Sequence, residues 1–163
     1  MGYYVVLSPF DEYTPRIGRK ELQAMAAITR KEARAQVFHL LFETEFHPET
    51  SPDQIYTLSR EDREFVEDAY IRRAYFGVCE HLDEIDEIMA RHSNGWKPSR
   101  ITPVSRSAIR LCIFEMKYMD DIPTTVSINE AIELVKTYDD PKMRTFVNGV
   151  LHGAKTELEA AAQ

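Results

Sequence analysis

Three cations gather at the start of the first long helical segment of the chain. Arg30, Lys31 and Arg34 lie within five residues, and the i, i+4 spacing of Arg30 and Arg34 places these two on one face of a helix. Cations at a helix N-terminus oppose the helix dipole, at a cost of roughly 0.3 kcal/mol or more, and a bound anion relieves that cost. The pattern indicates contact with phosphate groups, but only weakly, because surface cations are most often simply solvated.

A second group of candidate residues combines aromatic rings with cations. Tyr138, Lys142, Arg144 and Phe146 follow one another across a predicted helix junction. Single-stranded RNA is commonly held by stacking of its bases on aromatic side chains beside cations, and each stacked base contributes about 1–3 kcal/mol. The alternative is that Tyr138 and Phe146 anchor adjacent helices in the core.

No arrangement of residues indicates catalysis, a metal site or a cofactor. The histidines are scattered, and no two of them are spaced i, i+4 as a helical metal site requires. The sequence also contains no glycine-rich phosphate loop and no nucleophile elbow. We therefore predict that the protein is not an enzyme and uses neither cofactor nor metal.

Composition and charge limit the class of protein. The 163 residues are 44% hydrophobic and 29% charged, which is typical of a soluble globular protein. No apolar run is long enough to span a membrane, no signal peptide opens the chain, and Cys79 and Cys112 lie in apolar helical contexts. These features predict a cytoplasmic protein with reduced cysteines. The net charge of −7 argues against non-specific coating of nucleic acid but is compatible with a local basic patch.

The spacing of apolar residues predicts helices in the first half of the chain. Thr29 is a suitable N-cap for a helix that Pro48 brings to an end. Ser59 starts a sequence that resembles a capping box, which predicts a second helical segment running to about His92. Gly77 is the point where we expect this segment to break or bend, because glycine is unfavourable inside a helix.

The second half of the chain continues the helical pattern. We expect a helix over residues 104–119, a helix that begins with a capping box of Ser127 and Glu130, and a last helix from near Lys142. No alternating strand pattern follows residue 25. The predicted fold class is all-α, preceded by residues 1–24, which we expect to be a tag-like or weakly ordered extension. The alternative is a lineage-specific arm that covers an apolar surface through Tyr3, Tyr4, Val5 and Leu7.

Two short strings in the C-terminal third carry a family resemblance. Residues 127–136 read S-I-N-E-A-I-E-L-V-K, and residues 146–151 read F-V-N-G-V-L. The pair is similar to the closing signature of the NusB family of bacterial transcription antitermination factors, I-N-E-A-x-E-L-A-K followed by F-V-N-G-V-L. The resemblance spans about residues 28–155. It implies a NusB-like fold of two small helical bundles packed together, with 25–163 as an RNA-binding helical domain.

The resemblance also implies roles for individual residues. Family members begin with an arginine-rich helix start, R-R-x-x-A-R, that contacts RNA, and here residues 30–34 read R-K-E-A-R. The helix start before F-V-N-G shares that surface in the family. Arg110 with Glu115 is expected to form a buried ion pair, and Gly149 to permit close helix approach. The implied RNA-binding residues are Arg30, Lys31, Arg34, Phe42, Tyr138, Lys142, Arg144 and Phe146.

The function implied by the resemblance is that of an adaptor without a chemical step. Members of the family bind the boxA element of nascent ribosomal RNA together with ribosomal protein NusE, and they support antitermination by the transcription elongation complex. One alternative is a homodimeric or purely protein-binding NusB-like module. Another is the NusB-like domain of an rRNA methyltransferase system. We expect this to be less suitable, because the sequence ends at Gln163 without room for a cofactor-binding domain.

Overall fold

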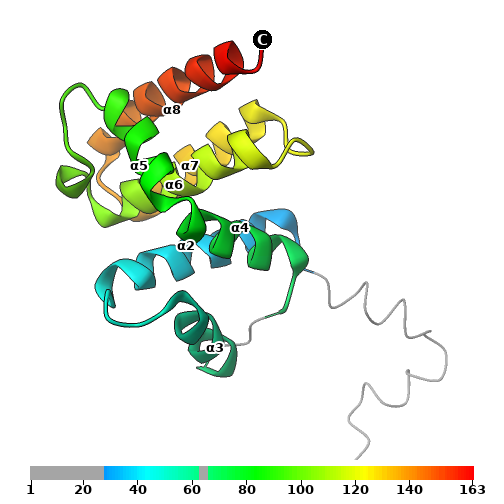
Figure 1. Cartoon of the computed structure of the whole chain (residues 1–163). Coiled ribbons are helices and arrows are strands. Elements are labelled where there is room, and N and C mark those ends of the chain that lie inside the picture. The colour runs from blue at the N-terminus through cyan, green and yellow to red at the C-terminus, as the bar shows by residue number, and fades with distance from the viewer. Residues whose placement is uncertain (1–27, 63–65) are drawn as a thin grey trace, which may run out of the picture.

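The structure is a computed structural model that describes residues 28–62 and 66–163, and all regular elements in these ranges are helices (Figure 1). They are α2 (Arg30–Phe46), α3 (Pro52–Asp62), α4 (Ala69–Glu80), α5 (Leu82–Arg91), the 3-10 helix η2 (Pro98–Arg100), α6 (Pro103–Tyr118), α7 (Thr124–Tyr138) and α8 (Pro141–Ala161). The all-α prediction is confirmed, whereas the predicted extension, 1–24, lies outside the described residues. No helix in the described ranges is both long and apolar enough to cross a membrane.

The helices form two groups that meet at α6. Figure 1 shows α2, α3 and α4 together in one group, with α5, α7 and α8 in the other. Helix α6 packs against α7 and α8 on one side and against α2 and α4 on the other. A single cluster of buried apolar side chains runs through both groups and includes Val37, Tyr75, Ile109 and Leu151. The predicted arrangement of two helical bundles packed together is confirmed.

Both cysteines belong to this interior, as predicted from their apolar contexts. Cys112 is buried, Cys79 is half-buried, and both are free thiols. Burial raises the pKa of Cys79 to about 11, despite a hydrogen bond with Tyr75 that opposes the shift. The thiol therefore stays protonated at neutral pH and behaves as a small apolar group.

The start of α2 is fixed by a complete capping box. The Thr29 hydroxyl accepts from the backbone N–H of Glu32 at 3.2 Å, and the Glu32 carboxylate accepts from the backbone N–H of Thr29 at 2.7 Å. This hydrogen bond to the backbone is the main reason that the pKa of Glu32 lies below its usual value. The predicted N-cap is confirmed, and the acidic residue within the basic motif has a structural role in holding the helix start.

Two predicted helix starts are wrong, and a proline explains each case. Ser59 lies inside α3, which begins at Pro52 after a capping interaction between Ser51 and Gln54. Ser127 lies inside α7, where its backbone N–H already donates to the carbonyl of Pro123 at 3.2 Å. Proline is favoured at or just before the first helical position, so these prolines begin the helices earlier than the capping-box-like sequences suggested.

The segment predicted from Ser59 to about His92 is not one helix broken at Gly77: it covers the end of α3, then α4 and α5. The chain leaves α4 after Glu80 and begins α5 at Leu82, with His81 between them. Gly77 lies within α4 where the ring of Phe114 on α6 covers it, and a Cβ at this position would overlap the ring. Gly149 is exposed on α8 with nothing within 4 Å of an added Cβ, so the expected close helix approach there is wrong.

We expect the two glycines to respond in opposite directions to replacement by alanine. Gly77→Ala should destabilise the protein by about 1–2 kcal/mol, because overpacking against Phe114 exceeds the gain in helix propensity. Gly149→Ala should stabilise it by up to about 1 kcal/mol, since only the propensity term applies. Urea unfolding followed by far-UV circular dichroism measures both effects. Equal stabilisation by the two changes would mean that Phe114 does not cover Gly77.

Candidate nucleic-acid interface

Arg30 and Lys31 are exposed in the first turn of α2, as the sequence predicted. The Arg30 guanidinium lies 4.3 Å from the centre of the Tyr70 ring on α4, within the range of a cation–π contact. Lys31 has no hydrogen bond or ion pair to any residue in the described ranges. These two side chains therefore present positive charge to solvent at the end of the helix.

Arg34 is not the surface cation that its sequence position suggested. Its side chain is 4% exposed, and its Nε donates to Oε1 of Glu115 on α6 at 2.8 Å. Its Nη1 lies 3.9 Å from the Glu130 carboxylate on α7. Burial is the largest single effect on Arg34 and by itself lowers its pKa, but the interactions with Glu115, Tyr70 and Glu130 together outweigh burial and the net shift is upward. Arg34 is thus a buried cation that joins α2 to α6 and α7.

Tyr70 completes this buried group from α4. Its hydroxyl donates to the Glu115 carboxylate in a short hydrogen bond. Burial and the adjacent charge of Glu115 raise the pKa of Tyr70 far above its usual range, so the hydroxyl remains a donor. Because the same ring faces Arg30, the buried group supports one of the exposed cations as well as the helix packing.

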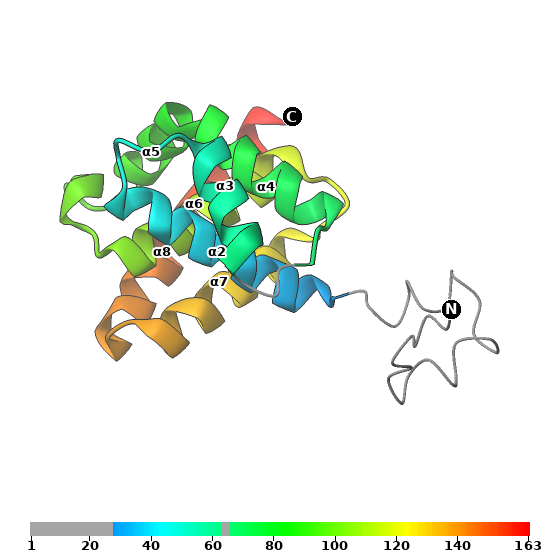
Figure 2. The ribbon, with the colours of Figure 1, turned by 90° about the horizontal axis from the view of Figure 1, so that it is seen from below.

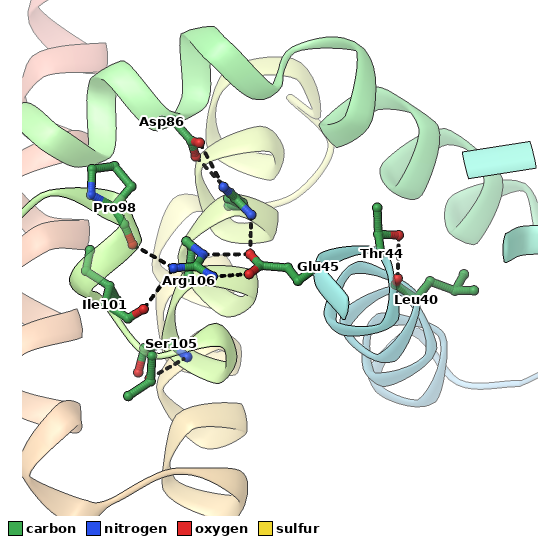
Figure 3. A network of polar contacts seen from close by, with 10 residues as sticks. Leu40, Thr44, Glu45, Asp86, Pro98, Ile101, Ser105 and Arg106 are labelled. Carbon is green, nitrogen blue, oxygen red and sulfur yellow. Dashed lines mark hydrogen bonds and ion pairs between the residues drawn. The ribbon is translucent and has the colours of Figure 1, made fainter. Parts of the chain in front are cut away.

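The predicted ion pair between Arg110 and Glu115 is wrong. Positions five apart on an α-helix are rotated by about 140°, so the two side chains leave α6 in different directions. Arg110 instead donates to Asp86 on α5 at 2.7 Å and to Glu45 on α2. Figure 3 shows Glu45 facing Arg106, which also donates to it. This second network holds the C-terminal end of α2 against α5 and α6.

Tyr138 lies at the surface at the end of α7, where it packs against α2. Its side chain is 49% exposed, so it is not the core anchor that the sequence left as an alternative. Its ring stacks on that of Phe38 with centroids 5.4 Å apart and an angle of 23° between the planes. Phe42, half-buried one turn further along α2, lies with its ring centre 6.5 Å from that of Phe38. Tyr138 therefore offers an exposed aromatic surface on a fixed support.

Lys142 and Arg144 are exposed in the first turn of α8, which follows Tyr138 directly. The helix start is fixed by Asp140, whose carboxylate accepts from the backbone N–H of Lys142 at 2.8 Å. Asp139 accepts hydrogen bonds from two residues at the start of α6, Thr102 and Ser105. These bonds hold the α7–α8 junction, and hence its cations, against α6.

Phe146 belongs to a different aromatic group. It is half-buried on α8 and packs against Trp96, with ring centroids 6.2 Å apart. Trp96 is 56% exposed in the turn before η2, and the sequence reasoning did not include it among the site residues. The sequence did contain a sign that Trp96 is exposed. It follows Asn94 and Gly95, which are typical of a surface turn, and it precedes a lysine.

A groove between α2 and α7 is lined by the exposed Lys31 and by Tyr138. Figure 2 shows these two helices next to each other. The groove has a volume of about 230 Å³ and is lined by Lys31, Arg34, Ala35, Glu130, Glu133, Leu134, Thr137 and Tyr138. Sequence reasoning missed Glu130 and Glu133 as lining residues, because it assigned the I-N-E-A-I-E-L string to helix capping and family recognition alone. The structure thus brings Lys31, Arg34 and Tyr138 together.

Comparisons with known proteins agree with these features. The NusB family model matches residues 31–156. Transcription antitermination protein NusB of Bacillus velezensis is 40% identical over 132 residues, which are 80% of this chain and 98% of the relative. T. maritima NusB superposes with a TM-score of 0.73 at 33% identity, covering 80% of this chain and 92% of that one.

A further solved structure of the same fold contains RNA. A chain of the crystal structure of antitermination factors NusB and NusE in complex with dsRNA matches with a TM-score of 0.71 at 26% identity, covering 78% of this chain and 96% of that one. Family model, relatives and fold agree with the motifs read from the sequence. The chain belongs to the NusB family.

Proposed function

We propose that this protein is a transcription antitermination factor that binds the boxA element of nascent ribosomal RNA together with NusE, in the cytoplasm and as part of the elongation complex. Its contribution is binding and assembly, with no chemical step. The observation that carries the proposal is the set of exposed cations at the starts of α2 and α8, with Lys31 lining the same groove as the exposed Tyr138, on a chain of the NusB family. Relatives bear the name transcription antitermination protein, which supports the same role.

The RNA surface we propose is smaller and better defined than the residue set expected from the sequence. It comprises Arg30, Lys31, Lys142 and Arg144 as exposed cations, with Tyr138 as a stacking ring, and is called the cation surface below. The buried Arg34 supports it from within. Phe42 packs against Phe38 and Phe46, and Phe146 packs against Trp96, so neither is assigned a direct stacking role.

Electrostatics explains how an acidic protein can use such a surface. The chain carries a net charge of −7, so attraction to RNA must come from where the cations are clustered. A partner that supplies further cations would strengthen the binding of RNA, and in the proposed complex we assign this role to NusE. The solved complex of NusB and NusE with dsRNA supports this assignment by family relationship. A homodimer that covers the cation surface is the competing assembly.

The cation surface predicts how RNA binding responds to salt. Each cation that neutralises a phosphate of single-stranded RNA contributes about −0.7 to the slope of log K against log salt concentration, so four cations give a slope of about −3. Equilibrium titration of a boxA-type RNA over a series of potassium chloride concentrations measures this slope. A slope near zero would exclude binding through the cation surface.

A further inference from the structure

The groove between α2 and α7 has the size of a site for one small planar group. Its volume of about 230 Å³ is below the ~300–1,000 Å³ of pockets that bind whole drug-sized ligands. Two apolar residues, Ala35 and Leu134, contribute to its lining, and Tyr138 forms an aromatic part of the wall. Phe38 stacks on one face of the Tyr138 ring and the ring of His39 packs nearly perpendicular to it at 5.5 Å, so a ligand can contact only the part of the 49% exposed residue that these two leave open.

The charges around the groove are balanced, unlike those of a phosphate site. Lys31 and Arg34 supply two positive charges, and Glu130 and Glu133 supply two negative charges. A phosphate would meet the two carboxylates as well as the cations. A neutral ligand with hydrogen-bond donors on one edge and acceptors on another would satisfy both kinds of group.

Several polar side chains in the groove have hydrogen-bond donors or acceptors that no described residue uses. Arg34 lines the groove, and its buried Nη2 has no hydrogen-bond partner among the described residues, which is costly for a charged donor. The exposed Glu133 carboxylate and the Lys31 ammonium form no hydrogen bond or ion pair with the described residues. Glu130, by contrast, is already close to Arg34. Donors and an acceptor are therefore available together in one small groove.

We propose that this groove binds a single guanine base of the RNA held on the cation surface, an inference that rests on the proposed function. The base lies against Tyr138, its N1–H and N2 amino group donate to the Glu133 carboxylate, and its O6 accepts from Arg34 or Lys31. Guanine carries two adjacent donors beside an acceptor, which matches a carboxylate beside a cation. Adenine, cytosine and uracil each place at least one acceptor where the carboxylate requires a donor.

The test uses short uridine-rich RNAs that differ at one central position, which is guanosine, inosine, adenosine or cytidine. Inosine keeps O6 and N1–H of guanosine but lacks the N2 amino group. We expect the wild-type protein to bind the guanosine RNA about tenfold more tightly than the inosine RNA, since a bidentate pair gives discrimination of roughly this size. Fluorescence anisotropy of end-labelled RNA gives the affinity ratios.

Glu133→Gln should reduce the guanosine-to-inosine ratio to less than about threefold, because it replaces one acceptor oxygen of the bidentate carboxylate by a donor. The matched control is Glu80→Gln, which makes the same charge change on an exposed residue of α4 and should leave the ratio unchanged. Far-UV circular dichroism confirms that each variant is folded.

The possible outcomes separate this inference from the proposed function. Equal binding of all four RNAs by the wild-type protein would overturn the guanine site while leaving RNA binding intact. A guanosine preference that survives in Glu133→Gln would also overturn it. Absence of binding to every RNA would overturn the guanine site, and binding of boxA RNA in the presence of NusE tests the proposed function separately.

Discussion

Arg34→Ala is expected to destabilise the protein by about 3–5 kcal/mol, the cost typical of removing one partner from a buried ion pair. The change leaves Glu115, which is 1% exposed, as a charge in the core with only the Tyr70 hydroxyl as a partner. It also removes the link from α2 to α6 and α7. Urea unfolding at neutral pH measures the loss as a lower midpoint.

Two further variants serve as controls for the loss of stability in Arg34→Ala. Arg30→Ala removes an exposed arginine of the same helix, and it should cost about 1 kcal/mol or less, the usual range for a cation–π contact at the surface. The double variant Arg34→Met with Glu115→Leu removes both charges and should be considerably more stable than Arg34→Ala alone. Equal effects of Arg34→Ala and Arg30→Ala would show that Arg34 is not buried against Glu115.

Arg30→Glu combined with Lys31→Glu is expected to weaken binding of boxA RNA at least tenfold without unfolding the protein. The double variant changes the charge of the cation surface at two exposed positions, so phosphate contacts are lost and like charges are introduced. Fluorescence anisotropy measures the affinity, and far-UV circular dichroism measures helicity. Combining Arg30→Glu with Arg34→Glu would not test this, because a buried glutamate beside Glu115 would disrupt the core.

A matched control reverses two exposed arginines elsewhere. Arg60 on α3 and Arg72 on α4 flank Glu67 and lie outside the cation surface. Arg60→Glu with Arg72→Glu changes the net charge by the same amount, so we expect an effect of about threefold or less from long-range repulsion alone. A loss as large as that of the Arg30 and Lys31 variant would mean that net charge, and not the cation surface, determines binding.

The fold was predictable from sequence where local chemistry decides the structure. The cap at Thr29, the helix over 104–119 and the absence of strands follow from residues close together in the chain. The errors at Ser59 and Ser127 are local as well, because a serine followed by an acidic residue fits a capping box wherever it occurs. In the structure the helices begin at Pro52 and directly after Pro123, and not at the two serines. A proline a few residues upstream is thus the stronger indicator of a helix start.

The candidate site was only partly predictable, because its decisive contacts join distant segments. The i, i+4 spacing of Arg30 and Arg34 indicates a shared face, but it does not say that Glu115, 81 residues away from Arg34, lies against that face. In the same way, no local signal distinguishes Gly77, which faces Phe114, from the exposed Gly149. Burial of a charged residue depends on a partner from another helix, and such pairing is not encoded in local spacing.

The most direct test of the account is the affinity of the protein for a labelled boxA-type RNA, measured by fluorescence anisotropy with the protein alone and with NusE. A scrambled RNA of the same composition serves as the control. We expect sequence-dependent binding that strengthens when NusE is present and weakens with added salt. Equal affinity for boxA and scrambled RNA, with no gain from NusE, would contradict the assignment of this protein as a boxA-binding antitermination factor.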